Sequence, residues 1–243
     1  MKKEMKIHLR IYFVLLLIMV ASGAKAQLQE TRQDFSFGFN GGMNLNSVSF
    51  TPSVKQKMNE GLVGGITGRM MCEKYFSLIC GIQAEVNYSQ RGWTENIDTT
   101  VSKDTYSRTM NFVEITFLAH IEVGKDAPEG VQGCINSGPQ GAFLISEKEH
   151  KSWSDTVNIA NLNRENSVNY QYIKAQSKFD YGLVGGGGVE IRTGAGSFLI
   201  EGRYYFGLSD FFNTGEGTRE FQRAAHQTIS LRLTYLFNVP KKK

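Results

Sequence analysis

Residues 76–91 read FSLICGIQAEVNYSQR, and apolar and polar side chains alternate along this stretch. The apolar positions are Phe76, Leu78, Cys80, Ile82, Ala84, Val86 and Tyr88. The positions between them are Ser77, Gly81, Gln83, Glu85, Asn87, Ser89 and Arg91, and only Ile79 departs from the pattern. Successive side chains of a β-strand point to opposite faces, so this stretch predicts a strand with one apolar and one polar face.

Seven further segments of the chain show the same alternation, which makes eight in all. It is clear in residues 35–46, 113–123, 179–192, 198–208 and 229–237, and weaker in residues 62–72 and 131–145. The short connections between segments are Glu73–Lys74, Gly124–Gly130 and Thr193–Gly196. The long connections are Leu45–Glu60, Gly92–Thr105, Glu147–Ser177 and Ser209–His226. Short periplasmic turns and long extracellular loops are typical of transmembrane β-barrels.

We therefore expect an all-β fold, an eight-stranded antiparallel up-and-down transmembrane β-barrel, in the bacterial outer membrane. A soluble lipocalin-like barrel would show the same alternation with its faces inverted, so it is the alternative. Lysine placement favours the membrane barrel. After residue 26, every lysine falls in a turn, a loop, a strand tip or the tail. A solvated strand face would use lysine, whereas a narrow lumen would not, because an ammonium group is hard to desolvate there.

The N-terminus has the features of a secretory signal peptide. Residues 1–10 are basic, Ile11–Val20 is an apolar run, and Ala24-Lys25-Ala26 is a small-residue cleavage site. We expect residues 1–26 to be removed and residues 27–243 to form one barrel domain. The chain has 27 basic and 23 acidic residues. The signal contains five of the basic residues and one of the acidic residues, so 22 of each remain. The basic charge leaves with the signal, and no nucleic-acid partner is expected.

Cys72, Cys80 and Cys134 are the three cysteines of the chain. With a turn at Glu73–Lys74, Cys80 would lie opposite Thr67, about 17 Å along the strand from Cys72. A disulfide needs Cα atoms within about 7 Å. The spacing therefore argues against a Cys72–Cys80 disulfide, and we interpret all three cysteines as strand residues with no metal-ligand spacing among them.

The turn at Thr193–Gly196 sets the register of the two strands around it. If Arg192 pairs with Ser197, Glu201 lies opposite Gly188 and Arg203 lies opposite Gly186, so each long charged side chain meets a glycine. An eight-stranded barrel is just wide enough inside for side chains to fill it. The expected lumenal charge network is Glu85, Glu114, Glu190, Glu201, Arg203 and Arg232. We expect these residues to plug the lumen as ion pairs, and a gated polar conduit is the alternative.

Aromatic residues gather near the predicted strand ends, as in the interfacial girdles of membrane barrels. Those near the short turns are Phe35, Phe76, Phe198, Tyr235 and Phe237. Those near the long loops are Tyr88, Trp93, Phe112 and Tyr181. A scatter of aromatics that reflects β-propensity alone is the alternative.

Three stretches resemble the porin-family outer-membrane β-barrels of the PorT-like type: residues 83–92 (QAEVNYSQRG), 112–115 (FVEI) and 179–190 (FDYGLVGGGGVE). The resemblance covers the whole chain after the signal. It implies the barrel fold and the outer-membrane location, and one named member of that family is a secretion-system component. The stretches describe barrel-wall geometry, so they imply no reaction.

No residue pattern in the chain predicts an enzyme. His120 lies near Glu114 and Glu122 on the polar face, His226 precedes the last strand, and no motif ties a serine to either. His150 falls in the longest loop. The run Gly185–Gly188 lacks the Lys-Ser/Thr and the helix of a phosphate-binding loop, so we interpret it as room for Glu201 and Arg203. We expect no catalytic residue, no metal and no cofactor.

The longest connection, Glu147–Ser177, is polar and contains Trp153, Tyr170 and Tyr172. Long loops on a rigid scaffold often bind partners, although they also vary freely. We expect a small non-catalytic barrel with a surface-interaction or envelope-structural role, embedded in outer-membrane lipid as a monomer. A protein partner, extracellular or in the envelope, would bind through the long loops. A narrow porin-like channel and an accessory component of a protein secretion system are the alternatives.

Overall fold

The computed structural model describes residues 31–51, 53–75, 78–96, 105–124, 129–152, 174–212 and 223–238. The predicted signal peptide lies outside these residues. The strands are β1 (Thr31–Thr51), β2 (Gln56–Lys57), β3 (Asn59–Tyr75), β4 (Leu78–Glu95), β5 (Tyr106–Val123), β6 (Gly130–Lys151), β7 (Phe179–Thr193), β8 (Gly196–Gly207) and β9 (Arg223–Asn238). Within these ranges, no helix has the length and apolar character to cross a membrane.

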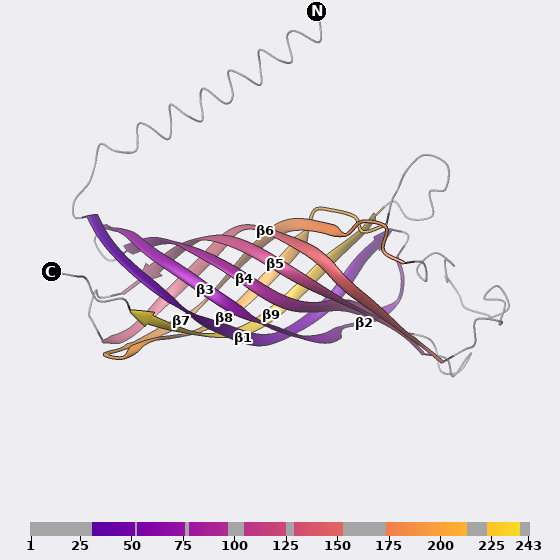
Figure 1. Cartoon of the computed structure of the whole chain (residues 1–243), viewed down its shortest axis with the longest axis horizontal. Coiled ribbons are helices and arrows are strands. Elements are labelled where there is room, and N and C mark those ends of the chain that lie inside the picture. The colour runs from indigo at the N-terminus through magenta and orange to yellow at the C-terminus, as the bar shows by residue number, and fades with distance from the viewer. Residues whose placement is uncertain are drawn as a thin grey trace, which may run out of the picture.

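Eight strands close into one antiparallel ring (Figure 1). Each of β3 to β8 pairs with the next strand in the chain, and β1 closes the ring by pairing with both β3 and β9. The predicted eight-stranded barrel is confirmed. The short strand β2 was not predicted, and it adds to β4 at the end of the long loops, where Gln56 pairs with Glu95. We call that end of the barrel the outer end, and the end with the short turns the inner end.

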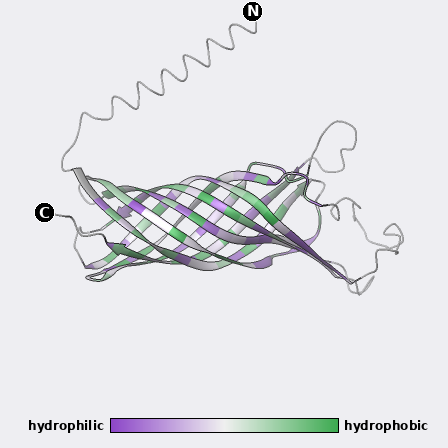
Figure 2. Ribbon diagram, viewed as in Figure 1, coloured by the Kyte–Doolittle hydropathy of each residue, from purple (hydrophilic) through white to green (hydrophobic). Residues whose placement is uncertain are grey.

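The apolar face of each strand points outward. Exposed apolar side chains cover the wall, among them Phe39 at 61%, Leu231 at 63% and Val131 at 68% of full exposure. The polar face points into the lumen, and Figure 2 shows the resulting alternation of hydrophobic and hydrophilic residues along the strands. A barrel in water would present the opposite faces, so the soluble lipocalin-like alternative is wrong.

The predicted register of β7 and β8 is confirmed. Arg192 pairs with Ser197, Glu201 with Gly188 and Arg203 with Gly186. A Cβ atom added at Gly188 would lie 1.9 Å from the carbonyl oxygen of Ile200. These glycines therefore let β7 approach β8 closely where the charged side chains enter the lumen.

The predicted turn at Glu73–Lys74 is wrong, because β3 continues to Tyr75, which pairs with Leu78. Cys80 lies opposite Glu73 rather than Thr67, so the distance that argued against a disulfide does not hold. The alternation of residues 78–91 extends back to Phe76 in the sequence, so it predicted an earlier strand start than the observed one at Leu78. The prediction that all three cysteines lie in strands is nevertheless confirmed, since they lie in β3, β4 and β6, and Cys72 and Cys80 are free as expected.

The predicted long loops are too long, because the strands continue at the outer end. Strand β1 reaches Thr51, β4 reaches Glu95, β6 reaches Lys151, and β9 begins at Arg223. Backbone pairing continues past the last residues that alternate clearly, and Figure 1 shows the long strands that result. The short connections at 124–130 and 193–196 agree with the strand ends.

Two of the predicted girdle aromatics lie inside the barrel. Trp93 is fully buried and Phe112 is 2% exposed. Trp93 is an odd number of residues from the outward Tyr88, so the period of two places it on the lumenal face. The outward aromatics are Phe35, Tyr88, Tyr181, Phe198 and Phe237, with Tyr235 partly buried. Phe76 lies outside the described side chains.

Candidate functional site: the filled lumen

The lumen holds buried charged side chains along its length. The structure places all six residues of the predicted network inside the barrel, and each is at most 4% exposed: Glu85, Glu114, Glu190, Glu201, Arg203 and Arg232. Sequence reasoning left out five residues that form ion pairs with the predicted network or with one another: Arg69, Arg91, Glu122, Asp180 and Arg192. All five occupy polar-face positions, so the signal that could have identified them is the same alternation.

The middle of the lumen is held by Arg203. Its Nη1 and Nη2 atoms donate to Glu85 Oε2 and Oε1 at 2.9 Å and 2.7 Å, and Nη2 also reaches Glu201 Oε2 at 2.7 Å. Arg232 Nη1 donates to Glu85 Oε2 at 3.0 Å. Two-point pairing between a guanidinium and a carboxylate offsets part of the desolvation cost of both groups.

The inner part of the lumen contains Glu122 and Glu190, bridged by two arginines. Arg69 Nη1 lies 3.2 Å from Glu122 Oε1 and also donates to Glu190. Arg192 contacts Glu190 at 3.4 Å and also donates to Glu122. His120 Nε2 lies 2.7 Å from Glu122 Oε1.

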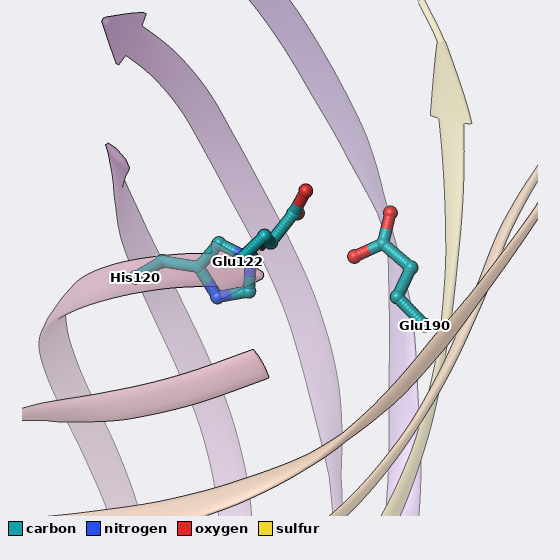
Figure 3. Close-up of side chains that lie close together, drawn as sticks. All are labelled: His120, Glu122 and Glu190. Atoms are coloured by element: carbon teal, nitrogen blue, oxygen red, sulfur yellow. Dashed lines mark hydrogen bonds and ion pairs between the residues drawn. The ribbon is translucent and has the colours of Figure 1, made fainter. Parts of the chain in front are cut away.

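His120, Glu122 and Glu190 could offer metal-ligating atoms that lie within 4.8 Å of one another. Figure 3 shows the carboxyl groups of Glu122 and Glu190 facing each other across the lumen. Both carboxylates, however, already bind Arg69 and Arg192. A divalent cation would add two positive charges beside two guanidinium groups in a site shielded from water, which is strongly unfavourable. The geometry therefore favours an ion-pair cluster over a metal centre.

Arg91 organises the outer part of the charged lumen. Its Nε and Nη2 atoms donate to Glu114 Oε1 at 2.8 Å and 2.5 Å, and Nη1 donates to Asp180 Oδ2 at 2.5 Å. Tyr205 donates its hydroxyl to the same Asp180 oxygen at 2.9 Å. The guanidinium also lies over the rings of Tyr205 and Phe112, 4.2 Å and 5.2 Å from their centroids. Arg91 thus joins the ion pairs to the apolar residues beyond them.

An apolar cluster, which we call the aromatic cap, closes the outer end of the lumen. Its buried members are Val48, Phe50, Val54, Trp93, Tyr106, Met110, Phe112, Ala142, Phe211, Phe212 and Ala224. Sequence reasoning missed the cap, because it assigned Trp93 and Phe112 to the girdle and Phe211 and Phe212 to a surface loop. The consecutive phenylalanines after β8 were the available signal. Ion pairs below and aromatic rings above leave the described lumen filled.

Neither buried histidine is arranged to activate a nucleophile. His120 contacts Glu122 and Asn136, and among the described residues neither ring nitrogen of His226 has a hydrogen-bond partner. In the part of the chain with described side chains, no serine hydroxyl bonds to either ring.

Shallow grooves lie on the outward face of the barrel wall. One has a volume of about 430 Å³ and is lined by Phe37, Ile66 and Phe117 among others.

The closed ring and outward apolar face agree with a comparison against known protein families. The family model described as an outer membrane protein beta-barrel domain matches residues 25–213. The chain belongs to this family. Its location is therefore the bacterial outer membrane, as predicted.

Solved structures of outer-membrane proteins are similar to this family member. OprG from Pseudomonas aeruginosa has 10% identity and a TM-score of 0.46, with 87% of this chain and 98% of that chain covered. Neisserial surface protein A has 10% identity and a TM-score of 0.39, with 82% and 96% covered. Ail, the attachment invasion locus protein of Yersinia pestis, has 12% identity and a TM-score of 0.34, with 85% and 100% covered. A comparison with curated proteins finds no match.

Proposed function

We propose that this protein is a non-catalytic, monomeric outer-membrane barrel that acts through its outer end, in surface interaction or in envelope structure. The filled lumen is the observation that supports this proposal. Paired charges occupy the middle of the barrel, and the aromatic cap closes its outer end. A barrel whose interior is filled serves as a scaffold, and its outer segments are then the parts available for binding.

The outer end is well suited to present a binding surface. Strands β5 and β6 continue their pairing to Tyr106 and Lys151, beyond the apolar wall. Arg108 lies 3.6 Å from Glu147 and 3.3 Å from Glu149 across this ribbon. These contacts stabilise the outer part of the β5–β6 pair, and the long connection to β7 starts from the end of β6.

The test replaces residues 150–174 with a short Gly-Ser linker. A matched control replaces the inner-turn residues 125–128 in the same way. Cells that display the native chain or the control should adhere to surfaces coated with matrix protein or glycosaminoglycan, and cells with the trimmed chain should not. Equal adhesion by the native and trimmed chains would contradict the surface role. If the trimmed chain instead restores detergent resistance to a deletion strain, the envelope-structural form of the proposal is supported.

The PorT-like resemblance belongs to this proposal, and with it an accessory role in protein secretion as an alternative. A deletion strain with normal secretion would remove that alternative. A narrow porin-like channel is the other alternative, and it requires an ion current through a lumen that the structure fills. The absence of catalysis is tested by His120→Ala and His226→Ala, which should leave the lipid profile of the membrane unchanged.

A further inference from the structure

Cys72 and Cys80 lie on neighbouring strands at the inner end of the barrel, on either side of the turn between β3 and β4. Met71 pairs with Gly81, and Glu73 pairs with Cys80. Cys72 is therefore the extra residue of a β-bulge, in which two residues of one strand oppose one residue of the other. The bulge places Cys72 beside the direct partner of Cys80.

Both thiols lie on the outward side of the wall. Met71 and Ile79 directly precede the two cysteines and point into the lumen, where they are 8% and 2% exposed. Successive side chains of a strand point to opposite faces, so Cys72 and Cys80 point outward. Both cysteines are partly exposed, which agrees with this position.

The register brings the two Cα atoms within the range of a disulfide. Residues directly opposite each other in an antiparallel pair have Cα atoms about 4.5–5.5 Å apart, and one step along a strand adds about 3.3 Å. Cys72 and Cys80 are offset by one such step, so their Cα atoms should lie about 6 Å apart. Disulfides span Cα distances of about 4.4–6.8 Å. The Cys72 thiol donates a hydrogen bond to Met70 O at 3.7 Å, and a thiol is a weak donor that is readily released.

Cys134 is too far away to compete for either thiol. It points into the lumen at 4% exposure, on the opposite face of the wall. Cys80 pairs with Ile121 of β5, and Cys134 of β6 pairs with the next residue, Glu122. Two strand spacings of about 4.8 Å each therefore separate β4 from β6 at this level. The three cysteines of the chain thus divide into one neighbouring pair and one buried single thiol.

The structure holds both outward cysteines as free thiols. We propose that Cys72 and Cys80 form a disulfide when the chain reaches the envelope, and that this bond fastens β3 to β4 at the bulge. The short turns of outer-membrane barrels face the periplasm, an oxidising compartment in which disulfides form and persist. The bond would secure the turn at which the pairing of the two strands is irregular. This inference does not depend on the surface role.

The electrons pass to an oxidant that carries a disulfide bond of its own. The thiolate of one cysteine attacks a sulfur of that bond, a mixed disulfide forms, and one thiol of the oxidant leaves. The thiolate of the other cysteine then attacks the protein sulfur of the mixed disulfide and releases the second thiol of the oxidant. The two protein thiols lose two protons and two electrons in total, and the oxidant takes up all four as it becomes two thiols.

The test counts free thiols in the full chain after its export to the outer membrane of a Gram-negative host grown in air. The cells are quenched in acid, and the denatured chain is alkylated with N-ethylmaleimide and weighed by mass spectrometry, with and without prior reduction. We expect one adduct without reduction, on Cys134, and three adducts after reduction. Two or three adducts without reduction would overturn the proposal.

A digest identifies the bond directly. Trypsin cleaves after Arg69, Lys74 and Arg91, so Cys72 and Cys80 fall in separate fragments, residues 70–74 and 75–91. The unreduced digest should contain these two fragments joined, and reduction should separate them. The proposal is also overturned if the unreduced digest contains them only as separate fragments.

Two single variants assign the thiols. Cys134→Ser should give no adduct without reduction and two adducts after it. Cys72→Ser should give two adducts in both conditions, because Cys80 then has no neighbouring thiol. An adduct on unreduced Cys134→Ser would contradict the pairing of Cys72 with Cys80.

A matched variant moves one thiol along the same strand and face. In Met70→Cys with Cys72→Ser, the new thiol also points outward, but residue 70 pairs with Ile82, which is two residues from Cys80. The two Cα atoms should then lie about 8 Å apart, beyond the range of a disulfide. We expect three adducts with and without reduction. A disulfide in this variant would contradict the register on which the proposal rests.

Discussion

Arg203 of β8 and Glu85 of β4 face each other across the lumen and form two hydrogen bonds, of 2.9 Å and 2.7 Å. The strands that carry them are not neighbours in the ring, so this pair joins opposite parts of the wall through the interior. The contact binds the barrel across its diameter and takes up space through which ions would pass.

Loss of Arg203 should destabilise the folded barrel strongly. Arg203→Met leaves Glu201 and part of Glu85 buried without their cation, and breaking a buried pair in this way costs about 3–5 kcal/mol. The measurement is the free energy of unfolding in urea with the chain in lipid vesicles. The exposed Lys178→Met is the control and should change stability by less than about 0.5 kcal/mol. Equal stability of both variants would contradict a structural role for the pair.

Gly188→Ala should weaken the β7–β8 contact. The added Cβ would lie 1.9 Å from Ile200 O, so the strands must separate, and overpacking of this kind costs about 1–3 kcal/mol. Gly202→Ala is the matched control in β8, because its Cβ would meet no atom within 4 Å. The temperature at which the folded band is lost on a heat-modifiability gel should fall for Gly188→Ala alone. A fall of the same size in both variants would count against the close approach.

Trp93 should be inaccessible to lipid. In the Trp153→Phe background, lipids brominated in their acyl chains should quench its fluorescence little, because the side chain is fully buried inside the barrel. A chain with Trp93→Phe, Trp153→Phe and Tyr88→Trp places the single tryptophan on the outward face and should be quenched strongly. Strong quenching of Trp93 would contradict its position inside the barrel and would place it in the lipid-facing girdle.

Cys134 should be protected from thiol reagents in the folded barrel. Its side chain points into the lumen and is 4% exposed. In a chain with Cys72→Ser and Cys80→Ser, a water-soluble maleimide should label Cys134 only after unfolding in urea. A Lys178→Cys variant without the native cysteines provides an exposed control next to the start of β7. Rapid labelling of Cys134 in the folded chain would indicate an open lumen.

The alternation of the sequence predicted the strands of the ring, the placement of lysine predicted the outward face, and the turn at Thr193–Gly196 predicted the β7–β8 register. Glu201 and Arg203 could be placed because each falls opposite a glycine, a relationship that one short turn determines. The turn after β3 was placed wrongly because the alternation of residues 78–91 extends back to Phe76 in the sequence, whereas β3 continues to Tyr75 and β4 begins at Leu78.

The partners of the lumenal charges could be predicted less well than the charges themselves. Arg91 and Asp180 come from strands far apart in the sequence, and their contact depends on how strands stagger around the ring. The aromatic cap was beyond prediction for a related reason. Phe211 follows β8 in a segment without alternation, so no periodicity indicates that its ring turns inward.

The most direct test of the filled lumen is a planar-bilayer recording of the refolded mature chain in symmetric salt, across voltage and pH. Because ion pairs occupy the middle of the lumen and the aromatic cap closes its outer end, we predict no discrete conductance steps. Reproducible, voltage-stable steps from the native chain would contradict the account and support a channel.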